Sequence, residues 1–420
     1  MSIELPLLFN NVSYVDKSGI KQFWDECYNA SGPGGKFFIN ISKRLSQSRF
    51  VGRNGEWSLP WEQKLIPGFE MLPYDPTFNL SFEQVTDNRA LEIKARIQAG
   101  EKFAVMYSGG IDSTVILASL LKNLTQEELT KVAVCTSIHA VYEFPSFWMK
   151  YIVDKIKVID SASNWYDDVI SLGYVPITGD EGDAILGTQI GLNLYHNYDY
   201  YVSLIPNYDQ RAILSKLKYS ISDPTVHFTN YKDIIIKHLA LDQSPEGLEF
   251  GRLLYLKYKK SVDTAVNAPP IQSLHDFFWW LIFDPKYLNC SVRASIYYNV
   301  TLPIRDVIDV QVNWFNGREY QLWSMNNNNN GQKIRKTVSS YKYAARKYIY
   351  DFDGDEWYFY FKTKLESLNN LAVKPKQRNF YGNEVIGVDC NYKPLVIQDP
   401  EVRDWFKERL VNYQIDWDHD

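Results

Sequence analysis

The sequence predicts an α/β protein built on a doubly wound parallel sheet. Short apolar runs alternate with helix-like segments between Phe103 and Thr178. Strands and helices alternating at this spacing are typical of a parallel sheet covered by helices on both faces. Aromatic, glycine and proline residues crowd positions 1–80, which predicts a small β-rich N-terminal unit. Helical patterns after about residue 190 predict a mainly helical C-terminal part.

The order of the elements follows from the apolar spacing. A helix over 82–99 leads into the sheet, and its strands are expected over 103–108, 132–138, 157–160 and 175–178. Helices are expected between them over 113–122, 144–155 and 164–172, the second with Pro145 in its first turn. Further helices are predicted over 234–241 and 248–257, and the run Phe277–Trp280 is expected on a buried helix face.

The bulk composition argues against several classes of protein. The 420 residues are 45% apolar, and the net charge of −5 disfavours a dedicated nucleic-acid binder, although a local basic patch over 333–347 stays open. The four cysteines form no C-x-x-C pair, which disfavours a zinc site or disulfide framework and fits a reducing cytoplasm. No signal-peptide pattern opens the sequence, and no apolar run approaches the ~20 residues of a membrane span. We therefore expect a cytoplasmic protein, with neither a membrane nor a nucleic acid as partner.

A glycine-containing run, Y-S-G-G-I-D-S-T from Tyr107 to Thr114, connects a predicted strand to a predicted helix. Backbone N–H groups in such a turn and the positive end of the helix dipole favour a bound phosphate, and glycines let the backbone approach it. Hydroxyl groups add donors, and Asp112 adds a carboxylate suited to Mg²⁺. The alternative is a glycine-rich turn without a ligand. The run predicts ATP binding through Ser108, Gly109, Gly110, Asp112, Ser113 and Thr114.

The set S-G-G-I-D-S resembles the pyrophosphate loop of the ATP pyrophosphatases, which release pyrophosphate and leave AMP on a substrate. The other common phosphate loop, G-x-x-x-x-G-K-[ST], does not occur in the sequence. Its nearest approximation, Gly32 to Lys36, has Ala30 in place of the first glycine and Phe37 after the lysine. We interpret that segment as a turn, so cleavage between the α and β phosphates is favoured over γ-phosphoryl transfer.

An acidic motif follows the last predicted strand. The run T-G-D-E-G-D-A-I-L-G from Thr178 to Gly187 brings together the carboxylates of Asp180, Glu181 and Asp183. Acids packed this closely repel one another unless a cation lies among them. An acidic turn in solvent is the simpler alternative. Because the carboxyl ends of parallel strands share one edge of the sheet, we expect this motif beside the glycine run.

The two motifs together resemble the synthetase domain of the asparagine synthetases and their relatives, which include β-lactam-forming and lasso-peptide-forming cyclases. That family shows S-G-G-x-D-S, then a G-E-G-x-D-E-x-x-G-G type run, then a late K-x-x-L-R type helix, here K-Y-A-A-R from Lys342 to Arg346. The stretch Leu302–Asp306 matches the family's R-x-P-F-L-D segment more weakly. The resemblance implies a sheet of the ATP pyrophosphatase type over 81–350, preceded by the unit 1–80 and followed by a C-terminal extension over 351–420 packed on it.

The resemblance also implies roles for individual residues. Asp112 and Asp183 would hold the Mg²⁺ that bridges the ATP phosphates. Asp180 would help to deprotonate the attacking amine, and Lys342 would stabilise the tetrahedral intermediate and the leaving group. A basic residue within Lys333–Lys336 would contact pyrophosphate. The simpler alternative for Lys342 is a solvated helix lysine.

Several positions depart from the family pattern. Glu181 replaces a glycine, Ala184 replaces an acid, and Thr188 follows Gly187 where a second glycine is usual. Ser2 stands where glutamine-dependent members expose an N-terminal cysteine, and about 100 residues before the glycine run are too few for their glutaminase domain. We therefore expect no glutamine hydrolysis, and an amine that is free ammonia, is supplied by a partner, or belongs to the substrate.

These observations predict an ATP-dependent, AMP-forming ligase that joins a small-molecule carboxylate to an amine or ammonia, with ATP and Mg²⁺ as cofactors. An enzyme of nucleobase or tRNA modification and a non-catalytic ATP-binding protein remain as alternatives. The run Asn326–Asn330 with Gly331 is either a disordered surface linker or a mobile lid near the nucleotide.

Overall fold

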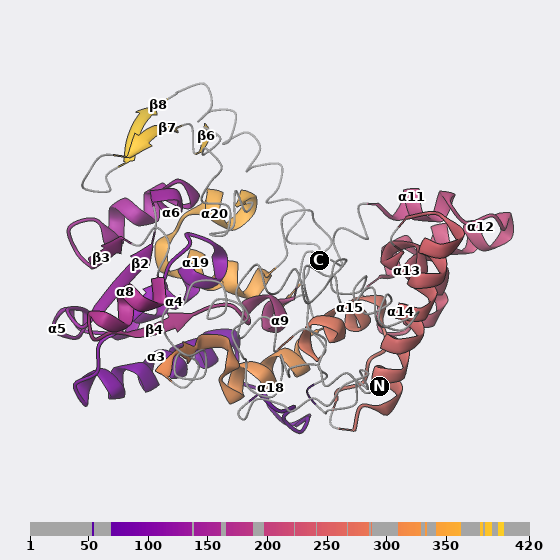
Figure 1. Cartoon of the computed structure of the whole chain (residues 1–420), viewed down its shortest axis with the longest axis horizontal. Helices are drawn as coiled ribbons and strands as arrows, with labels where there is room; N and C mark the ends of the chain where they lie inside the picture. Colours follow the sequence, from indigo (N-terminus) through magenta and orange to yellow (C-terminus); the bar gives the residue numbers. More distant parts are fainter. Residues whose placement is uncertain are drawn as a thin grey trace, which may run out of the picture.

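The computed structural model of the chain is drawn in Figure 1. It describes Arg53, 69–136, 138–160, 165–187, 197–221, 223–240, 242–266, 268–284, Tyr287, 310–328, 332–333, 342–362, 379–380, 383–388 and 394–398. Most of the predicted N-terminal unit over 1–80 lies outside the described residues, and so do Ser2, Thr188, Leu302–Asp306 and most of the predicted extension over 351–420.

A five-stranded sheet, with all strands parallel, forms the centre of the fold in the order β3-β2-β1-β4-β5. Its strands are β1 (Phe103–Met106), β2 (Val132–Thr136), β3 (Lys157–Asp160), β4 (Val175–Thr178) and β5 (Val312–Asn313). The chain runs outward from β1 to β3 and then returns to the other side of β1 with β4. The strand order therefore reverses between β1 and β4, and ligands of doubly wound sheets bind beyond the carboxyl ends of strands at such a point.

Helices cover both faces of the sheet, as predicted. Phe103 and Val105 of β1 belong to the larger apolar core with residues of α4 (Ile111–Asn123), and α3 (Phe82–Gln98) packs on α4. Ala104 and Met106 face the opposite side, in a smaller cluster with residues of α8 (Trp165–Ser171). Side chains of a strand alternate between faces, so this division of the core follows directly from the apolar run.

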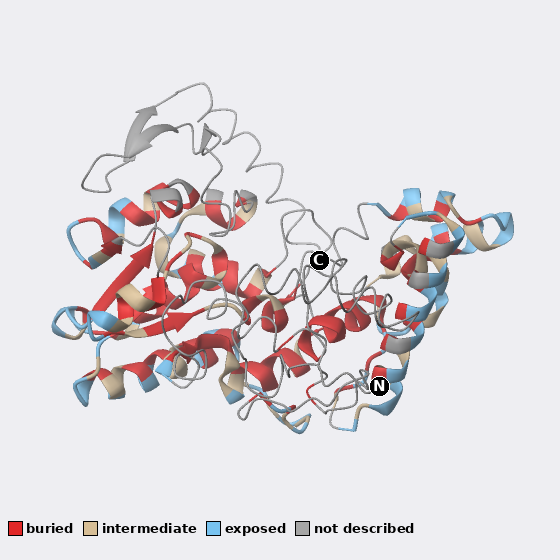
Figure 2. Ribbon diagram, viewed as in Figure 1, coloured by how far each residue is buried: buried red, intermediate tan, exposed pale blue. Residues whose placement is uncertain are grey.

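A helical lobe follows the first four strands. It contains α11 (Tyr198–Ser203), α12 (Tyr208–Leu217), α13 (Lys232–Leu239), α14 (Pro245–Thr264) and α15 (Leu274–Phe283), with 3-10 turns at Lys218–Ser220 and Phe228–Tyr231. All ten residues of α15 are buried, which confirms the buried face expected for Phe277–Trp280, whereas α12 and α14 carry exposed residues on their outer faces (Figure 2). No helix among the described residues is long and apolar enough to cross a membrane.

The remaining elements return to the sheet and then leave it. A 3-10 turn, Trp314–Asn316, follows β5 and leads to α18 (Arg318–Asn326); α19 (Tyr343–Asp353) and α20 (Glu356–Phe361) come next. Three antiparallel strands, β6 (Asn379–Phe380), β7 (Asn383–Val388) and β8 (Pro394–Gln398), form a second sheet. Strand β7 lies next to the short helix α6 (Ile138–Glu143) (Figure 1). The C-terminal part is thus mainly helical up to α20, but it also contains a small sheet that the sequence did not predict.

The bounds of several elements between β1 and α9 differ from the predicted ones. Both β3 and β4 span the expected residues, whereas β1 ends at Met106 because Tyr107 and Ser108 enter the turn. The expected helix over 144–155 is a short α-helix, α7 (Pro145–Phe147), continued by a π-helix, Trp148–Ile152, in which the Val153 N–H donates to the Trp148 carbonyl. Short helices α5 (Gln126–Leu129), α6 (Ile138–Glu143) and α9 (Gly182–Leu186) complete this part of the fold.

Acid sensitivity is expected at a buried histidine of the lobe. His275 is 4% exposed, and its ring nitrogens have no hydrogen-bond partner. Burial lowers its pKa to about 4; Asp276 opposes the shift and Lys333 adds to it. Because the unfolded state takes up the proton first as the pH falls from about 6.5 to 4, folding should lose about 2 kcal/mol by pH 5.

The variant His275→Leu removes this group, so its unfolding free energy should fall about 2 kcal/mol less than that of the wild type between pH 7 and pH 5. Urea titrations at the two pH values measure the difference. Equal losses in both proteins would contradict the expected neutral, buried ring.

Candidate active site

The first half of the site is the turn between β1 and α4. Gly109 adopts a φ of +70°, and a Cβ at this position would lie 2.5 Å from Glu143 Cβ and 2.6 Å from the Ala140 carbonyl oxygen. Only glycine combines that backbone conformation with so close an approach. The run therefore needs glycine for its fold, independently of any phosphate.

Hydroxyl groups line this turn. The Ser108 N–H donates to Ser113 Oγ at 3.2 Å, and the two serine hydroxyls lie 3.2 Å apart. The Gly110 N–H donates to Ser108 Oγ at 3.3 Å. No side chain caps the start of α4, so the positive end of this 13-residue helix is open to a ligand at the turn.

Thr114 lies elsewhere. It is fully buried, and its hydroxyl faces the phenol groups of Tyr107 and Tyr358 inside the core. Burial raises the pKa of both phenols, which accordingly stay neutral. The Thr114 side chain thus supports the turn from behind, and its contact with ATP stays a prediction.

The second half of the site is the turn between β4 and α9. A Cβ on Gly182 would lie 2.5 Å from both Cγ and Oδ1 of Asp112, and one on Gly179 would lie 3.2 Å from Asp112 Cβ. The backbone of the acidic motif thus packs directly on the first carboxylate of the glycine run. The two motifs meet at the switch point between β1 and β4, as predicted.

Lys342 joins the two halves. Its ammonium donates to Asp112 Oδ1 and Oδ2 at 2.7 and 2.6 Å, and it lies 2.7 Å from Asp183 Oδ1. Lys342 is 3% exposed, so it is not a solvated helix lysine. Two carboxylates predicted from separate motifs therefore lie within hydrogen-bond distance of one atom, Lys342 Nζ, which belongs to a third motif.

The backbone around Lys342 is also constrained. Lys342 has a φ of +56°, which costs a non-glycine residue about 1–2 kcal/mol. The following N–H groups, of Tyr343 and Ala344, donate to the carbonyls of Lys333 and Gln332. This backbone arrangement places Lys342 at the first position before α19, next to the start of α4.

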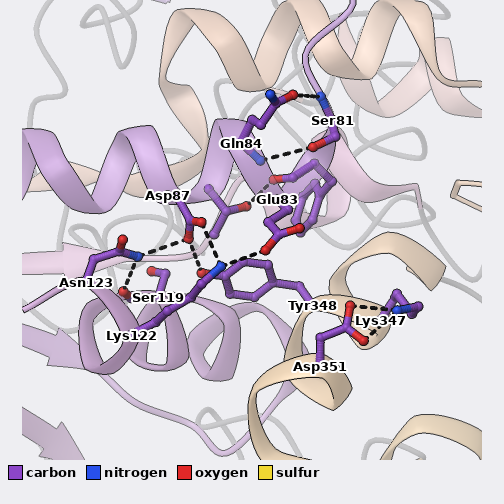
Figure 3. Close-up of polar contacts among 12 residues, drawn as sticks. Ser81, Glu83, Gln84, Asp87, Ser119, Lys122, Asn123, Lys347, Tyr348 and Asp351 are labelled. Atoms are coloured by element: carbon purple, nitrogen blue, oxygen red, sulfur yellow. Dashed lines mark hydrogen bonds and ion pairs between the residues drawn. The ribbon is translucent and has the colours of Figure 1, made fainter.

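Polar contacts lock α19 against α3 and α4 (Figure 3). Asp87 of α3 accepts from the Tyr348 hydroxyl at 2.6 Å, from Lys122 Nζ at 2.7 Å and from Asn123 Nδ2 at 3.0 Å. Burial alone would raise the pKa of Asp87, but these donors lower it below its usual value. This junction could not be predicted from the sequence, because its residues are spread over three helices.

Hydrogen bonds hold α9 from the other side. Trp279 Nε1 donates to the Ala184 carbonyl at 3.1 Å, and Ser324 Oγ donates to the Ile185 carbonyl at 2.8 Å. Lys333 is fully buried and donates to Ser324 and to Asn328 Oδ1. Lys333 therefore has a structural role, while Arg335 and Lys336, the other basic residues of the predicted pyrophosphate contact, lie outside the described residues.

The asparagine run is built into the same cluster. Asn328 is buried and also donates to Asp276 Oδ1, while Asn326 and Asn327 donate to the carbonyls of Leu322 and Trp323. These three residues thus have defined hydrogen-bond partners, and the two hypotheses for the run, a disordered linker and a mobile lid, stay untested. Asn329 and Asn330 lie outside the described residues.

Asp180 differs in exposure from Glu181 and Ala184, the two departures from the family pattern that the structure describes. Asp180 is half-buried in the turn before α9, while Glu181 and Ala184 are fully buried. Neither Glu181 nor Ala184 is therefore accessible to solvent.

The donor set suits a magnesium ion that arrives with phosphates. Among the residues that the structure describes, no three or more His, Cys, Asp or Glu side chains cluster as a metal site. Asp112 and Asp183 nevertheless approach a single ammonium, so their oxygens lie within two hydrogen-bond lengths of each other. Mg²⁺ is commonly held by one or two carboxylates together with substrate phosphates, and this pair fits that pattern.

Comparisons with family models, curated proteins and solved structures find no match for this chain. The site is therefore interpreted from its own geometry.

Asp112, Asp183 and Lys342 could be located from the sequence. Gly179 and Gly182, which let the two halves of the site meet, were not identified from it. Their spacing around the acids was the one available signal.

Gly182→Ala should displace the Asp112 carboxylate, because the new Cβ needs the space of Cγ and Oδ1. We expect ATP-dependent pyrophosphate exchange to fall at least about 100-fold with the fold retained, since small misplacements of reacting groups have effects of this size. Gly317→Ala is the matched control, because its Cβ would meet side-chain atoms only at 3.7 Å or more. Equal activity in the two variants would contradict the close packing.

Proposed function

We propose that this protein is an ATP-dependent, AMP-forming carbon–nitrogen ligase of the asparagine synthetase-like type, built on a sheet of the ATP pyrophosphatase class. The observation that supports it most is the convergence of Asp112, Asp183 and Lys342 on one point at the switch point of the sheet. These residues were selected by resemblance from three motifs that lie far apart in the sequence.

The glycine turn supports the binding of a triphosphate. Ser108, Ser113 and the open start of α4 present donors at the end of β1, where anions bind in such sheets. Asp112 and Asp183 would hold Mg²⁺, which neutralises phosphate charge and polarises the reacting phosphoryl group when bound. ATP and Mg²⁺ are thus the proposed cofactors.

The chemistry divides into two steps. A substrate carboxylate oxygen attacks the α-phosphorus of ATP, pyrophosphate leaves, and an acyl-adenylate remains. An amine then attacks the acyl carbon, AMP leaves with the electrons of the broken C–O bond, and the amine proton passes to a base. Asp180, in the turn between β4 and α9, is the proposed base.

Lys342 would act in the second step. Negative charge develops on the carbonyl oxygen and on the leaving phosphate, and a fixed ammonium lowers the energy of that charge. The burial of Lys342 strengthens such an interaction, because little water screens it.

The acid and the amine are proposed only as classes: a small-molecule carboxylate, and ammonia or an amine that the substrate or a separate partner supplies. The absence of a C-x-x-C pair supports a cytoplasmic location.

ATP–pyrophosphate exchange against a panel of carboxylic acids tests the proposal. We expect exchange that depends on one class of acid and on Mg²⁺, with AMP as the nucleotide product after an amine is added. Formation of ADP, or pyrophosphate release that no acid stimulates, would refute it.

A further inference from the structure

Lys342 occupies the position between the two carboxylates that the magnesium ion would need. Its ammonium lies 2.6 and 2.7 Å from the oxygens of Asp112 and 2.7 Å from Asp183 Oδ1. The Lys342 side chain is 4% exposed, whereas those of Asp112 and Asp183 are 27% and 47% exposed. The cation lies beneath the two acids, while the acids still face the solvent from which a ligand enters.

We propose that Lys342 serves as the resident cation of the nucleotide-free site and excludes free divalent metal from Asp112 and Asp183. Resting on the proposed function, the inference adds that the metal enters only together with the triphosphate. Asp112 and Asp183 would then hold the metal in place of Lys342, whose ammonium would become available to the reacting acyl group.

The electrostatic balance supports this exchange. With Lys342 in place, the three side chains carry a net charge of −1, so a bare divalent ion gains little by entering. Removing the ammonium leaves two acids within two hydrogen-bond lengths, whose mutual repulsion a divalent ion relieves. A triphosphate brings negative charge of its own. The divalent ion and the Lys342 ammonium would then each have an anionic group to interact with.

The backbone of Lys342 is held in place by contacts that do not involve its side chain. Its φ of +56° lies in the left-handed region, and such strain persists only where the surroundings hold it in place. The neighbouring N–H groups of Tyr343 and Ala344 are fixed by Lys333 and Gln332. The side chain can therefore exchange partners while the start of α19 stays where it is.

Binding of Mn²⁺ in the absence of nucleotide, followed by electron paramagnetic resonance, tests the inference without any turnover of ATP. The wild type should show no saturable site at this centre, whereas Lys342→Met should bind one Mn²⁺ at least about ten-fold more tightly. Lys347→Met is the matched control, because Lys347 lies on the exposed face of α19 and pairs with Asp351. Adding Asp183→Asn to Lys342→Met should abolish the new site.

Thermal unfolding gives a second readout. Mn²⁺ should raise the melting temperature of Lys342→Met but not that of the wild type, since a ligand stabilises only the state that binds it. Lys342→Gln, which keeps a donor for one carboxylate, replaces the methionine variant if that variant does not fold.

Equal Mn²⁺ binding by wild type and variant, whether tight or absent in both, would overturn the inference. Neither result bears on pyrophosphate exchange, so a failure here leaves the proposed ligase intact. Conversely, tight Mn²⁺ binding by Lys342→Met would support the inference even if no carboxylic acid supported ATP–pyrophosphate exchange.

Discussion

Asp112→Asn should reduce acid-dependent ATP–pyrophosphate exchange at least about 1,000-fold. Asp112 accepts both hydrogen bonds from Lys342, and it lies in the first turn of α4 beside the glycine turn. The amide removes the negative charge that holds Lys342 and that would hold the metal, and about 4 kcal/mol of lost stabilisation corresponds to this change in rate. Exchange is measured with the acid that the panel identifies.

The control for this variant makes the same substitution at an equivalent helix position. Asp209 lies in the first turn of α12, is exposed, and belongs to the helical lobe. Asp209→Asn should keep wild-type exchange and a wild-type melting curve. More than a tenth of wild-type exchange in Asp112→Asn would remove Asp112 from the proposed chemistry.

Gly109→Ala should lower the free energy of unfolding by about 3 kcal/mol or more. The φ of +70° alone costs an alanine about 1–2 kcal/mol, and forcing its Cβ against Glu143 Cβ and the Ala140 carbonyl adds an overpacking term of about 1–3 kcal/mol. The neighbours cannot simply move aside, because Glu143 is itself held in a buried ion pair with Lys362.

Gly173→Ala separates the two contributions. Gly173 has a φ of +76°, but a Cβ there would meet nothing within 4 Å, so only the backbone term of about 1–2 kcal/mol should appear. Urea unfolding of the two variants gives the difference, which we attribute to the close approach. Similar losses in both would show that the packing behind the turn can yield.

Much of the fold could be predicted from sequence, because its strands are short buried runs. Lys157–Asp160 and Val175–Thr178 coincide with the expected strands, and the alternation of Phe103 to Met106 between two cores follows from strand geometry. By contrast, β5 has two residues, Val312 and Asn313, and no local pattern distinguishes so short a strand. It forms because β4 offers an unpaired edge.

The role of a side chain could not be predicted from the sequence where it depends on the buried groups around that side chain. Thr114 belongs to the right motif, yet the period of α4 turns its side chain into the core. Lys333 was one of several basic residues near the site, and only the tertiary structure reveals the carbonyl and amide oxygens around its ammonium. Neither environment is encoded in the neighbouring sequence.

The buried ammonium between two acids also bears on how the chain acquires its structure during synthesis. A nascent chain that has emerged as far as α9 carries both Asp112 and Asp183 without the counter-charge, which arrives only with α19. Docking of α19 then lowers the net charge of this cluster from −2 to −1. Ribosome-bound intermediates that stop short of it would expose an uncompensated acidic surface to chaperones and to stray divalent ions.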